Sequence, residues 1–446
     1  MKKYDNYKDS GIEWIGEIPE HWDRIRIKSL VAIKVTDGPH ETPQWIENGV
    51  PFISAEAIKG NKIDLDFKRG YISTEQHLEY CKKSKVLKND ILFCKSGSTT
   101  GKSALVDTDV DFGIWSPLAI IRADKNKIDY KYLFQSIQSS LFQNQVETAW
   151  TFGTQPNIGM GALENLWIAI PTLEEQQSIA NYLDHKTTQI DTLIAKKEQF
   201  ISLLQEERTA VINQAVTKGL DPKVKMKDSG IEWLGEIPEH WKLMRVGSLS
   251  QCITGFAFKS DNFSFENGIK IVRGDNVTEN SLRWGDKTRY WNEYSEVLDR
   301  FQLQKNDIVI GMDGSKVGKN YAYVEEKDLP LLLVQRVARI RSNSELIAKW
   351  IHFNIGTYNF KYYINLSKTD PAIPHITLKN ITSYPICIPD INELNLIIEK
   401  LNSKLEKLDE TLKKSKQEIE LLKEYKTALI SEVVTGKVDV RDVILN

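Results

Sequence analysis

"KDSGIEWIGEIPEHW" at Lys8–Trp22 recurs at Lys227–Trp241 as "KDSGIEWLGEIPEHW", with a single Ile-to-Leu difference. Two copies of so long a phrase, about half a chain apart, indicate a tandem internal repeat and thereby decide the architecture. The proline in each copy breaks a helix, while Gly and Trp suit a stiff, packed connection. We therefore expect each copy to form an elbow, pinned by the tryptophans Trp14, Trp22, Trp233 and Trp241.

The repeat continues beyond this phrase. "VLKNDILFCKSGSTTGK" (Val86–Lys102) and "LQKNDIVIGMDGSKVGK" (Leu303–Lys319) share KNDI and a G-S-x-x-G-K frame. Further on, "EERTAVINQAVTKG" (Glu206–Gly219) aligns with "EYKTALISEVVTGK" (Glu424–Lys437). The chain is thus a tandem duplication of about 218 residues. By this symmetry, the C-terminus is expected to return beside the first elbow.

The second part of each copy has a helical period. Apolar residues at alternating steps of four and three form a heptad seam, which favours a coiled coil. The seam residues are Ala180, Leu183, Thr187, Ile190, Ile194, Lys197, Ile201, Leu204, Arg208, Val211 and Ala215 in the first copy, and Leu394, Ile398, Leu401, Leu405, Leu408, Leu412, Ser415, Ile419, Leu422, Lys426, Leu429 and Val433 in the second. Polar breaks at Lys197/Ser415 and Arg208/Lys426 are expected to fix the register. We predict two helices of about 40 residues, roughly 60 Å long, packed antiparallel.

A globular part, here called the first or the second head, precedes each helix. Short apolar strands, helices and Gly, Asn and Asp turns predict an α+β fold, with two α/β heads separated by two long α-helices in a pseudo-twofold tandem repeat. The heads diverge in sequence: "TDGPHETPQW" from Thr36 aligns with "TGFAFKSDNF" from Thr254. The predicted boundaries are 1–22 for the first elbow, 23–172 for the first head, 173–218 for the central helix, 219–241 for the linker and second elbow, 242–390 for the second head, 391–437 for the C-terminal helix and 438–446 for the tail.

The composition is that of a soluble globular protein, with 446 residues, 41% hydrophobic and 27% charged, and a net charge of −2. No apolar run is long enough to span a membrane, and "MKKYDNYKDS" leads into no signal-peptide core, so we expect a cytoplasmic protein. The four cysteines are scattered and are expected to be free thiols. The balanced charge argues against a generally basic nucleic-acid binder.

Basic residues nevertheless gather locally in both copies. "CKKSKVLKNDILFCKSGSTTGK" carries six lysines and one aspartate, and the second head has the arginine-rich stretches "IVRGDNVTENSLRWGDKTRY" and "VQRVARIRS". Lys and Arg beside Gly, Ser and Thr suit contact with phosphates, because small residues let backbone N–H groups approach. Ordinary solvated lysines would give a similar composition, but the same loop is basic in both copies.

Two motifs suggest other chemistry. "GSTTGKS" at Gly97–Ser103 resembles a nucleotide-binding loop but has one residue too few between its glycines, and the second copy replaces the final Ser with Asn320. His77, Cys81 and Cys94 suggest zinc, yet the second copy has no counterparts. Motifs of metalloproteases, hydrolases and dinucleotide-binding enzymes are absent from the sequence. A recognition or scaffold subunit is therefore favoured over an enzyme.

The doubled phrase, the divergent heads, the repeated helices and the KNDI…GS..GK frame together resemble a type I restriction–modification specificity subunit over essentially the whole chain. The resemblance implies that each head is a target-recognition domain for one half of a bipartite double-stranded DNA site, with the helices as a ruler for the gap. It implies two S-adenosylmethionine-dependent adenine methyltransferase subunits and motor–nuclease restriction subunits as partners. S-adenosylmethionine, ATP and Mg would belong to those partners, and this chain would have no cofactor and no catalysis of its own. The alternatives are a coiled-coil scaffold without DNA specificity and a nucleotide-binding enzyme using Gly97–Ser103.

Carried onto this sequence, the resemblance implies that loops of the heads contact DNA. Lys and Ser suit phosphates, whereas Asp, Gln, Asn, Arg and His suit base edges. The residues implied in the first head are Thr36, Asp37, His40, Thr42, Lys95, Ser96, Ser98, Thr99, Lys102, Thr151 and Gln155. Those implied in the second head are Lys259, Ser260, Arg273, Asn276, Asp313, Ser315, Lys316, Lys319 and His375.

Overall fold

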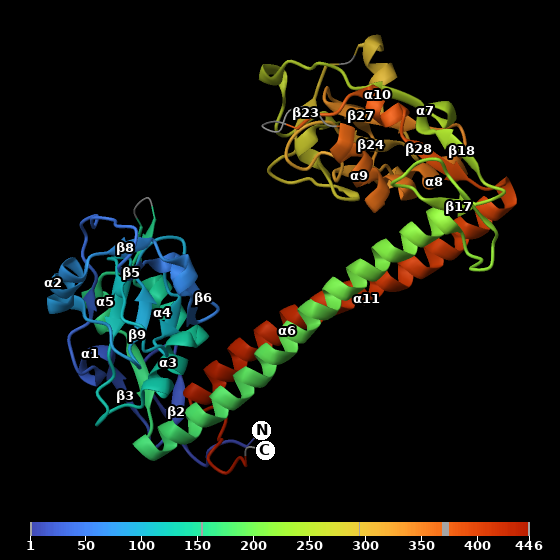
Figure 1. Ribbon diagram of the computed structural model, residues 1–446. Coiled ribbons are helices and arrows are strands. Elements are labelled where there is room, and N and C mark those ends of the chain that lie inside the picture. The colour runs from blue at the N-terminus through green and yellow to red at the C-terminus, as the bar shows by residue number, and fades with distance from the viewer. Residues whose placement is uncertain (1, 153–154, 294, 368–373, 445–446) are drawn as a thin grey trace. The chain divides into compact units, whose positions relative to one another are not determined.

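The computed structural model describes residues 2–152, 155–293, 295–367 and 374–444, without the side chains of residues 151 and 152. It divides into two compact units. The first unit joins Met1–Glu198 to Lys416–Asn446, and the second unit is Gln199–Ser415. Each unit therefore contains one head together with one part of each long helix (Figure 1).

The elements from the N-terminus to the end of the first long helix are, in order, β1 (Tyr7–Asp9), β2 (Glu17–Pro19), β3 (Asp23–Arg26), α1 (Ile27–Leu30), β4 (Thr36–Asp37), β5 (Val50–Ile53), β6 (Ile58–Lys59), β7 (Lys62–Ile63), β8 (Gly70–Ile72), α2 (Thr74–Ser84), β9 (Ile91–Cys94), β10 (Ser103–Leu105), β11 (Gly113–Ile114), β12 (Leu118–Ile121), α3 (Tyr130–Gln138), α4 (Ser140–Thr148), β13 (Thr151–Phe152), β14 (Pro156–Asn157), α5 (Met160–Glu164), β15 (Trp167–Ile170) and α6 (Leu173–Lys218).

The second half of the chain has the elements β16 (Met226–Asp228), β17 (Glu236–Pro238), β18 (Lys242–Arg245), α7 (Val246–Leu249), β19 (Gln251–Thr254), β20 (Ile269–Val272), β21 (Val277–Thr278), β22 (Ser281–Leu282), β23 (Tyr290–Trp291), β24 (Ile308–Gly311), β25 (Tyr321–Tyr323), β26 (Leu331–Leu333), β27 (Val337–Arg341), α8 (Glu345–Ile355), α9 (Tyr358–Ser367), α10 (Leu378–Thr382), β28 (Pro385–Ile388) and α11 (Ile391–Val434).

The two heads share one sheet topology although their sequences diverge. The first head has a four-stranded sheet in the order β10–β9–β12–β4 and a three-stranded sheet in the order β11–β5–β8. The second head repeats both, as β25–β24–β27–β19 and β26–β20–β23. The parallel pair of β5 with β11 is also repeated, by β20 with β26. The predicted α+β tandem repeat is confirmed, and the divergent heads are copies of one fold.

The central strands of each four-stranded sheet are apolar at nearly every position because both faces of the sheet are buried. In β9, Ile91 and Phe93 face one hydrophobic core, while Leu92 and Cys94 face another. Strand β24 alternates between two cores in the same way. Side chains of a strand point to opposite faces in turn, so each central strand is packed from both sides. The loops after β9 and β24 therefore leave from firmly held strand ends.

The long helices α6 and α11, of 46 and 44 residues, pair antiparallel within each unit. In the first unit Lys426 binds Asp191 at 2.7 Å and Lys197 binds Glu418 at 2.5 Å, so the numbering falls along one helix as it rises along the other. In the second unit Arg208 binds Asp409 at 3.2 Å. The predicted antiparallel coiled coil is confirmed. Its charged seam residues reach carboxylates of the opposite helix, and the fourth polar break, Ser415, is buried.

Each copy of the doubled phrase folds into a two-stranded hairpin, β1 with β2 and β16 with β17. The turn of the first hairpin needs glycine, because Gly11 and Gly16 have φ of +66° and +69°. Trp22 and Trp241 are buried, and each donates its indole N–H over 3.2 Å to a glutamate in the first turn of a long helix. The expectation for Trp14 is wrong, because Trp14 is 41% exposed; its repeat Trp233, in the same turn of the second hairpin, is instead partly buried and stacks on Tyr384 with 6.0 Å between ring centroids.

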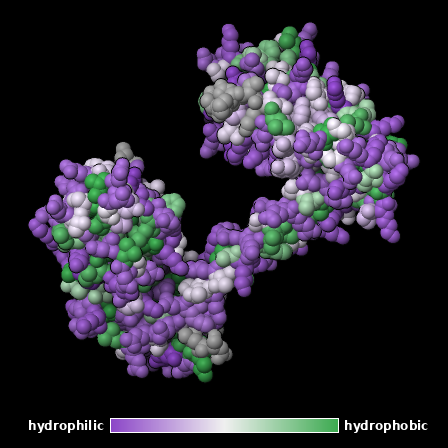
Figure 2. All heavy atoms as spheres, in the orientation of Figure 1, coloured by the Kyte–Doolittle hydropathy of each residue, from purple (hydrophilic) through white to green (hydrophobic). Residues whose placement is uncertain are grey.

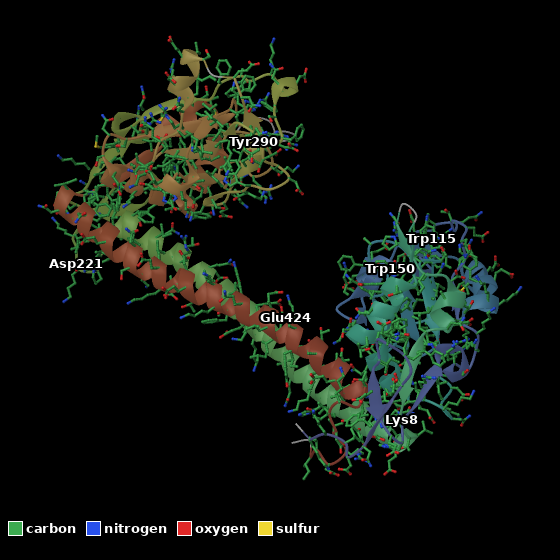
Figure 3. All side chains as sticks on the ribbon, turned by 180° about the vertical axis from the view of Figure 1, so that it is seen from behind. Lys8, Trp115, Trp150, Asp221, Tyr290 and Glu424 are labelled. Carbon is green, nitrogen blue, oxygen red and sulfur yellow. The ribbon has the colours of Figure 1, made fainter. Side chains whose placement is uncertain are left out.

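The two ends of the chain meet in the first unit (Figure 1). The Asp439 N–H donates to the Lys2 carbonyl at 2.9 Å, and the Tyr7 hydroxyl donates to the Gly436 carbonyl at 3.0 Å. Figure 3 shows Lys8 of the first hairpin beside the paired helices, as expected if the C-terminus returns to the first elbow. In the second unit the chain instead runs without a break from the end of α6 into the second hairpin.

The face of each head seen in Figure 2 is mainly hydrophilic, with apolar residues scattered between charged ones. Among the described helices, none has a stretch both long and apolar enough to cross a bilayer.

Candidate nucleic-acid interface

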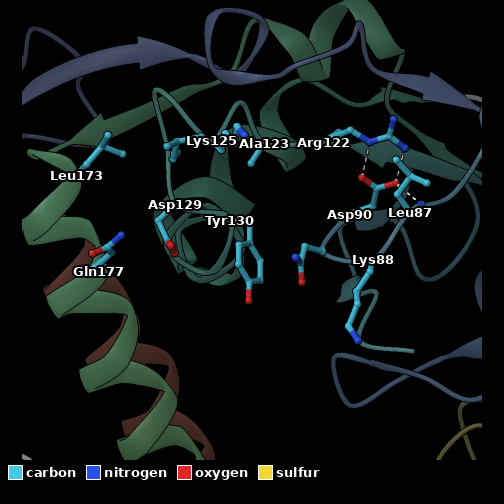
Figure 4. A pocket seen from close by; sticks show the side chains of 12 residues that line it. Leu87, Lys88, Asp90, Arg122, Ala123, Lys125, Asp129, Tyr130, Leu173 and Gln177 are labelled. Carbon is cyan, nitrogen blue, oxygen red and sulfur yellow. Dashed lines mark hydrogen bonds and ion pairs between the residues drawn. The ribbon is translucent and has the colours of Figure 1, made fainter. Parts of the chain in front are cut away.

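The shared KNDI motif forms the turn that leads into the central strand of each head. Its asparagine has φ of +71° in both copies, a left-handed conformation that Asn tolerates better than most residues. The Asp90 carboxylate accepts two hydrogen bonds of 2.7 Å from the Arg122 guanidinium, beside a hollow of about 360 Å³ (Figure 4). Asp307 and Arg341 repeat this pair at 2.7 and 2.6 Å. KNDI is therefore a structural motif that sets the start of the strand.

The G-S-x-x-G-K frame forms a tight loop at the other end of the same strand. Gly97 and Gly101 have φ of +93° and +94°, and Gly314 and Gly318 have +93° and +82°, so both positions require glycine. In the first head the loop connects strand β9 to strand β10. A nucleotide-binding loop needs a helix after it, whose N-terminus faces the phosphates. The nucleotide-binding alternative is therefore inconsistent with the fold.

A second segment docks on this loop in both heads. The Gly97 N–H donates to the Pro156 carbonyl at 3.0 Å, and the Gly314 N–H donates to the Pro374 carbonyl at the same distance. Pro156 of the stretch "WTFGTQPN" is thus held against the glycine loop "GSTTGK". Thr151 lies in β13, but its side chain is outside the described part of the chain.

In the first head, the buried carboxylate of Asp37 joins two other predicted residues, Lys95 and His40, to Lys83. Asp37 is fully buried, and its oxygens lie 2.7 Å from Lys83 Nζ, 3.2 Å from Lys95 Nζ and 3.1 Å from His40 Nε2. Burial alone would raise the pKa of Asp37, but hydrogen bonds from Lys83 and Lys95 hold it below its usual value. Asp37 is therefore a buried, ionised partner of these cations, and a direct contact of Asp37 with a base stays a prediction.

In the second head, the corresponding place is a hollow of about 420 Å³. Its lining includes Thr254, Asp313, Arg336 and His375. The Arg336 Nη1 donates to an Asp313 carboxylate oxygen at 2.7 Å, and the backbones of Asp313 and His375 form an isolated bridge. The acidic anchor and its cation thus occur in both heads but come from different chain positions.

The backbone frame relates the two sites position by position. The Lys95 N–H donates to the Pro117 carbonyl at 2.9 Å, and the Met312 N–H donates to the Arg336 carbonyl at 3.0 Å. The sequence alignment paired Thr254 with Thr36. The strand register instead makes Asp37, one residue further along the first head, the counterpart of Thr254. On one frame, the two heads therefore place different side chains: Asp37 and Thr254, Lys95 and Met312, Ser96 and Asp313, Pro117 and Arg336, and Asn157 and His375.

The other predicted residues differ in exposure. Those that are exposed are His40, Thr42, Ser98, Lys102, Gln155, Lys259, Ser260, Ser315, Lys316, Lys319 and His375. Those that are partly buried are Thr36, Lys95, Ser96, Thr99, Arg273 and Asp313. Asn276 is fully buried, and its side chain bonds to the backbone of Arg273, Arg283 and Lys287. Asn276 thus closes a turn of its own segment, and its assignment to a base edge stays a prediction.

Sequence reasoning missed Lys83, Asn157 and Arg336, which the fold brings to these sites. Lys83 lies at the end of α2 and reaches Asp37 across 46 positions of sequence. Arg336 lies in "VQRVARIRS", which the composition had marked as basic without distinguishing among its arginines. A comparison of the two copies strand by strand, rather than by sequence, would have found Arg336.

The zinc site suggested by His77, Cys81 and Cys94 is supported by one short contact between two of these residues. Cys81 Sγ lies 3.4 Å from His77 Nε2, and His77 also binds Asp111 at 3.1 Å. Within the described ranges, no group of three or more His, Cys, Asp and Glu side chains is arranged to hold a metal ion. All four cysteines are free thiols.

Comparison with known proteins adds to this geometry. Residues 19–202 and 238–421 each match the type I restriction modification DNA specificity domain. The chain is 27% identical to the MjaVIII specificity subunit of Methanocaldococcus jannaschii, over 99% of this chain and 97% of that protein. It is 23% identical to the EcoKI specificity subunit of Escherichia coli, over 86% of this chain and 82% of that protein.

Solved structures show the same fold. A chain from a structure of the type I R-M system aligns with a TM-score of 0.70 at 15% identity, covering 94% of this chain and 99% of that chain. The HsdS subunit from Thermoanaerobacter tengcongensis aligns with a TM-score of 0.51 at 18% identity, covering 94% and 98%. These likenesses extend over both heads and both long helices.

Proposed function

The chain belongs to the type I restriction modification DNA specificity family and is a specificity subunit, and we propose that each of its heads reads one half of a bipartite DNA site. The observation that supports this most is the shared frame with exchanged side chains. The same hydrogen bonds hold both sites, while Lys95 and Pro117 of the first head stand where the second has Met312 and Arg336. Two readers of different sequences need this combination of constant backbone and variable polar groups.

In this proposal, the exposed lysines of the repeated glycine loop contact DNA phosphates. Lys102 and Lys319 close the G-S-x-x-G-K frame in the two heads, and both are exposed. Exposed lysines on a tight glycine loop can neutralise phosphates and release counterions. The constant loop would then hold the DNA backbone, and the variable residues beside it would select bases.

The coiled coil would set the gap between the half-sites and recruit two adenine methyltransferase subunits, with motor–nuclease restriction subunits joining that core. Apolar side chains remain exposed on the helix pair of the first unit, at Leu193, Leu421 and Tyr425, and they could pack against partner helices. Methyl transfer, cleavage and their cofactors S-adenosylmethionine, ATP and Mg would belong to the partners. This chain would work in the cytoplasm and catalyse nothing itself.

Mapping of N6-methyladenine across a host genome, with and without the gene for this chain, tests the proposal. We expect one bipartite motif, interrupted by a gap of constant length, to lose methylation when the chain is absent. Exchange of the first head for that of a relative should alter one half of the motif and leave the other half intact. A motif that is continuous, or that does not depend on this chain, would contradict the proposal.

A further inference from the structure

Arg336 occupies a backbone position that most residues avoid. Its φ is +68°, in the short connection between β26 and β27. The Arg336 carbonyl accepts the Met312 N–H, and the Gln335 N–H donates to the Phe256 carbonyl at 2.8 Å, so the turn is held on both sides. The first head has Pro117 here, whose ring forbids a positive φ. A strained arginine fixed by its surroundings points to a function of its side chain.

The side chain of Arg336 is exposed yet oriented. It is 71% exposed, whereas the Asp313 side chain that binds its Nη1 at 2.7 Å is 21% exposed. Asp313 is itself held by the backbone bridge to His375. The carboxylate thus fixes the guanidinium through Nη1. The remaining donors of Arg336 are left at the rim of the 420 Å³ hollow.

This arrangement suits a base better than a phosphate. A guanidinium beside a carboxylate forms a nearly neutral pair, and that carboxylate repels a phosphate brought to the same place. The edge of guanine is uncharged and offers two acceptors, N7 and O6, at the spacing of an arginine fork. Lys316 and Lys319, which are exposed on the neighbouring loop, are better placed by charge for phosphates.

We propose that Arg336 reads a guanine in the half-site of the second head and that Asp313 is the positioning residue that orients it. This inference rests on the proposed function of the second head as a DNA reader. It predicts a guanine contact at one position of the second head's half-site and no equivalent contact in the first head, where Pro117 occupies this place.

Arg336→Gly is the most informative variant, because glycine adopts a φ of +68° without strain and the turn should fold as before. The full chain, in complex with its methyltransferase subunits, is incubated with a double-stranded DNA library that is randomised over the whole site. The DNA that binds is recovered and sequenced. For Arg336→Gly we expect the preference for one guanine to fall by about tenfold to a hundredfold, with the other half-site unchanged. Arg336→Lys keeps the charge but lacks the fork, so it should lose most of the same preference.

Lys305→Gln serves as the control, because Lys305 is exposed at the opposite end of β24, and its motif should match that of the wild type. An unchanged motif in Arg336→Gly overturns the inference. Uniform weakening of all sequences with the motif intact also overturns it, because that result assigns Arg336 to a phosphate. A wild-type complex that selects no bipartite motif refutes the proposed function itself, which separates that failure from failure of the guanine assignment.

Discussion

Glu175 is the residue on which we expect the first elbow to depend most. Its side chain is 5% exposed and accepts hydrogen bonds from Tyr4 Oη at 2.6 Å and Trp22 Nε1 at 3.2 Å. Burial, together with this bond, raises the pKa of Tyr4 above its ordinary value of about 10, so the phenol stays a donor at neutral and at alkaline pH. Glu175→Ala leaves both donors buried without their acceptor, and each costs about 1–3 kcal/mol. We expect the first unit to lose about 3 kcal/mol of stability.

The duplication supplies a matched variant. Glu393 holds the second elbow through Trp241 at 3.2 Å and His240 at 2.7 Å, but its side chain is 28% exposed. Water can replace a lost acceptor there, so Glu393→Ala should cost about 1 kcal/mol in the second unit. Glu174→Ala, an exposed neighbour of Glu175, is the control and should change stability by less than about 0.5 kcal/mol.

Amide hydrogen exchange on the full chain is the appropriate assay, because a two-unit protein does not melt in a single two-state transition. Protection of the β1–β2 hairpin should fall by roughly a hundredfold in Glu175→Ala, and that of the β16–β17 hairpin by roughly fivefold in Glu393→Ala. Equal losses in the two hairpins would refute the reasoning. Such a result would show that the buried hydrogen bond from Tyr4 adds no stability to the first elbow.

Three further predictions concern the heads and the helices. Lys102→Gln should weaken DNA binding about equally for all sequences and lower the slope of log K against log salt by about 1, as measured by titration at several salt concentrations; a changed motif would speak against a phosphate contact. Asp37→Asn should destabilise the first head by about 2 kcal/mol at neutral pH. The pKa of Asp37 is lowered in the folded state, so its contribution to the free energy of unfolding is present above the unfolded pKa of about 4 and is lost as the pH falls through the folded pKa. The denaturation curves of the wild type and the variant should therefore converge as the pH falls below about 4. Insertion of four residues into both long helices should lengthen the gap of the methylated motif without altering either half-site, and an unchanged gap would exclude the helices as a ruler.

Much of the fold could be predicted because its signals are local or repeated. The heptad seam is a period that any 20-residue window shows, and the doubled phrase relates the two halves without knowledge of either structure. Trp14 shows where such reasoning fails. The residue type suits a packed elbow, but whether a tryptophan is buried depends on what the rest of the fold places beside it: Trp233 stacks on Tyr384, whereas Trp14, in the same turn of the first hairpin, is 41% exposed.

The candidate site could be predicted as loops but not as contacts. Asp37 was selected as a base reader because carboxylates accept from bases, yet the fold buries it beneath Lys83 and Lys95. Asn276 was selected for its amide, which instead closes a turn of its own segment. Polar residues in loops look alike in sequence, because their role depends on partners that lie far away along the chain.

By itself, the sequence determined the duplication, the two long helices, the glycine loop and the family, since each is written in periods, spacings or repeated letters. Only the tertiary structure decided that the divergent heads are one fold, that Asp37 is buried beside Lys95 while Asp313 binds Arg336, and that Arg336 stands where the first head has Pro117. The reason is physical. Strand pairing and buried ion pairs join residues tens of positions apart, and their free energy depends on distance and burial that no local pattern of residues records.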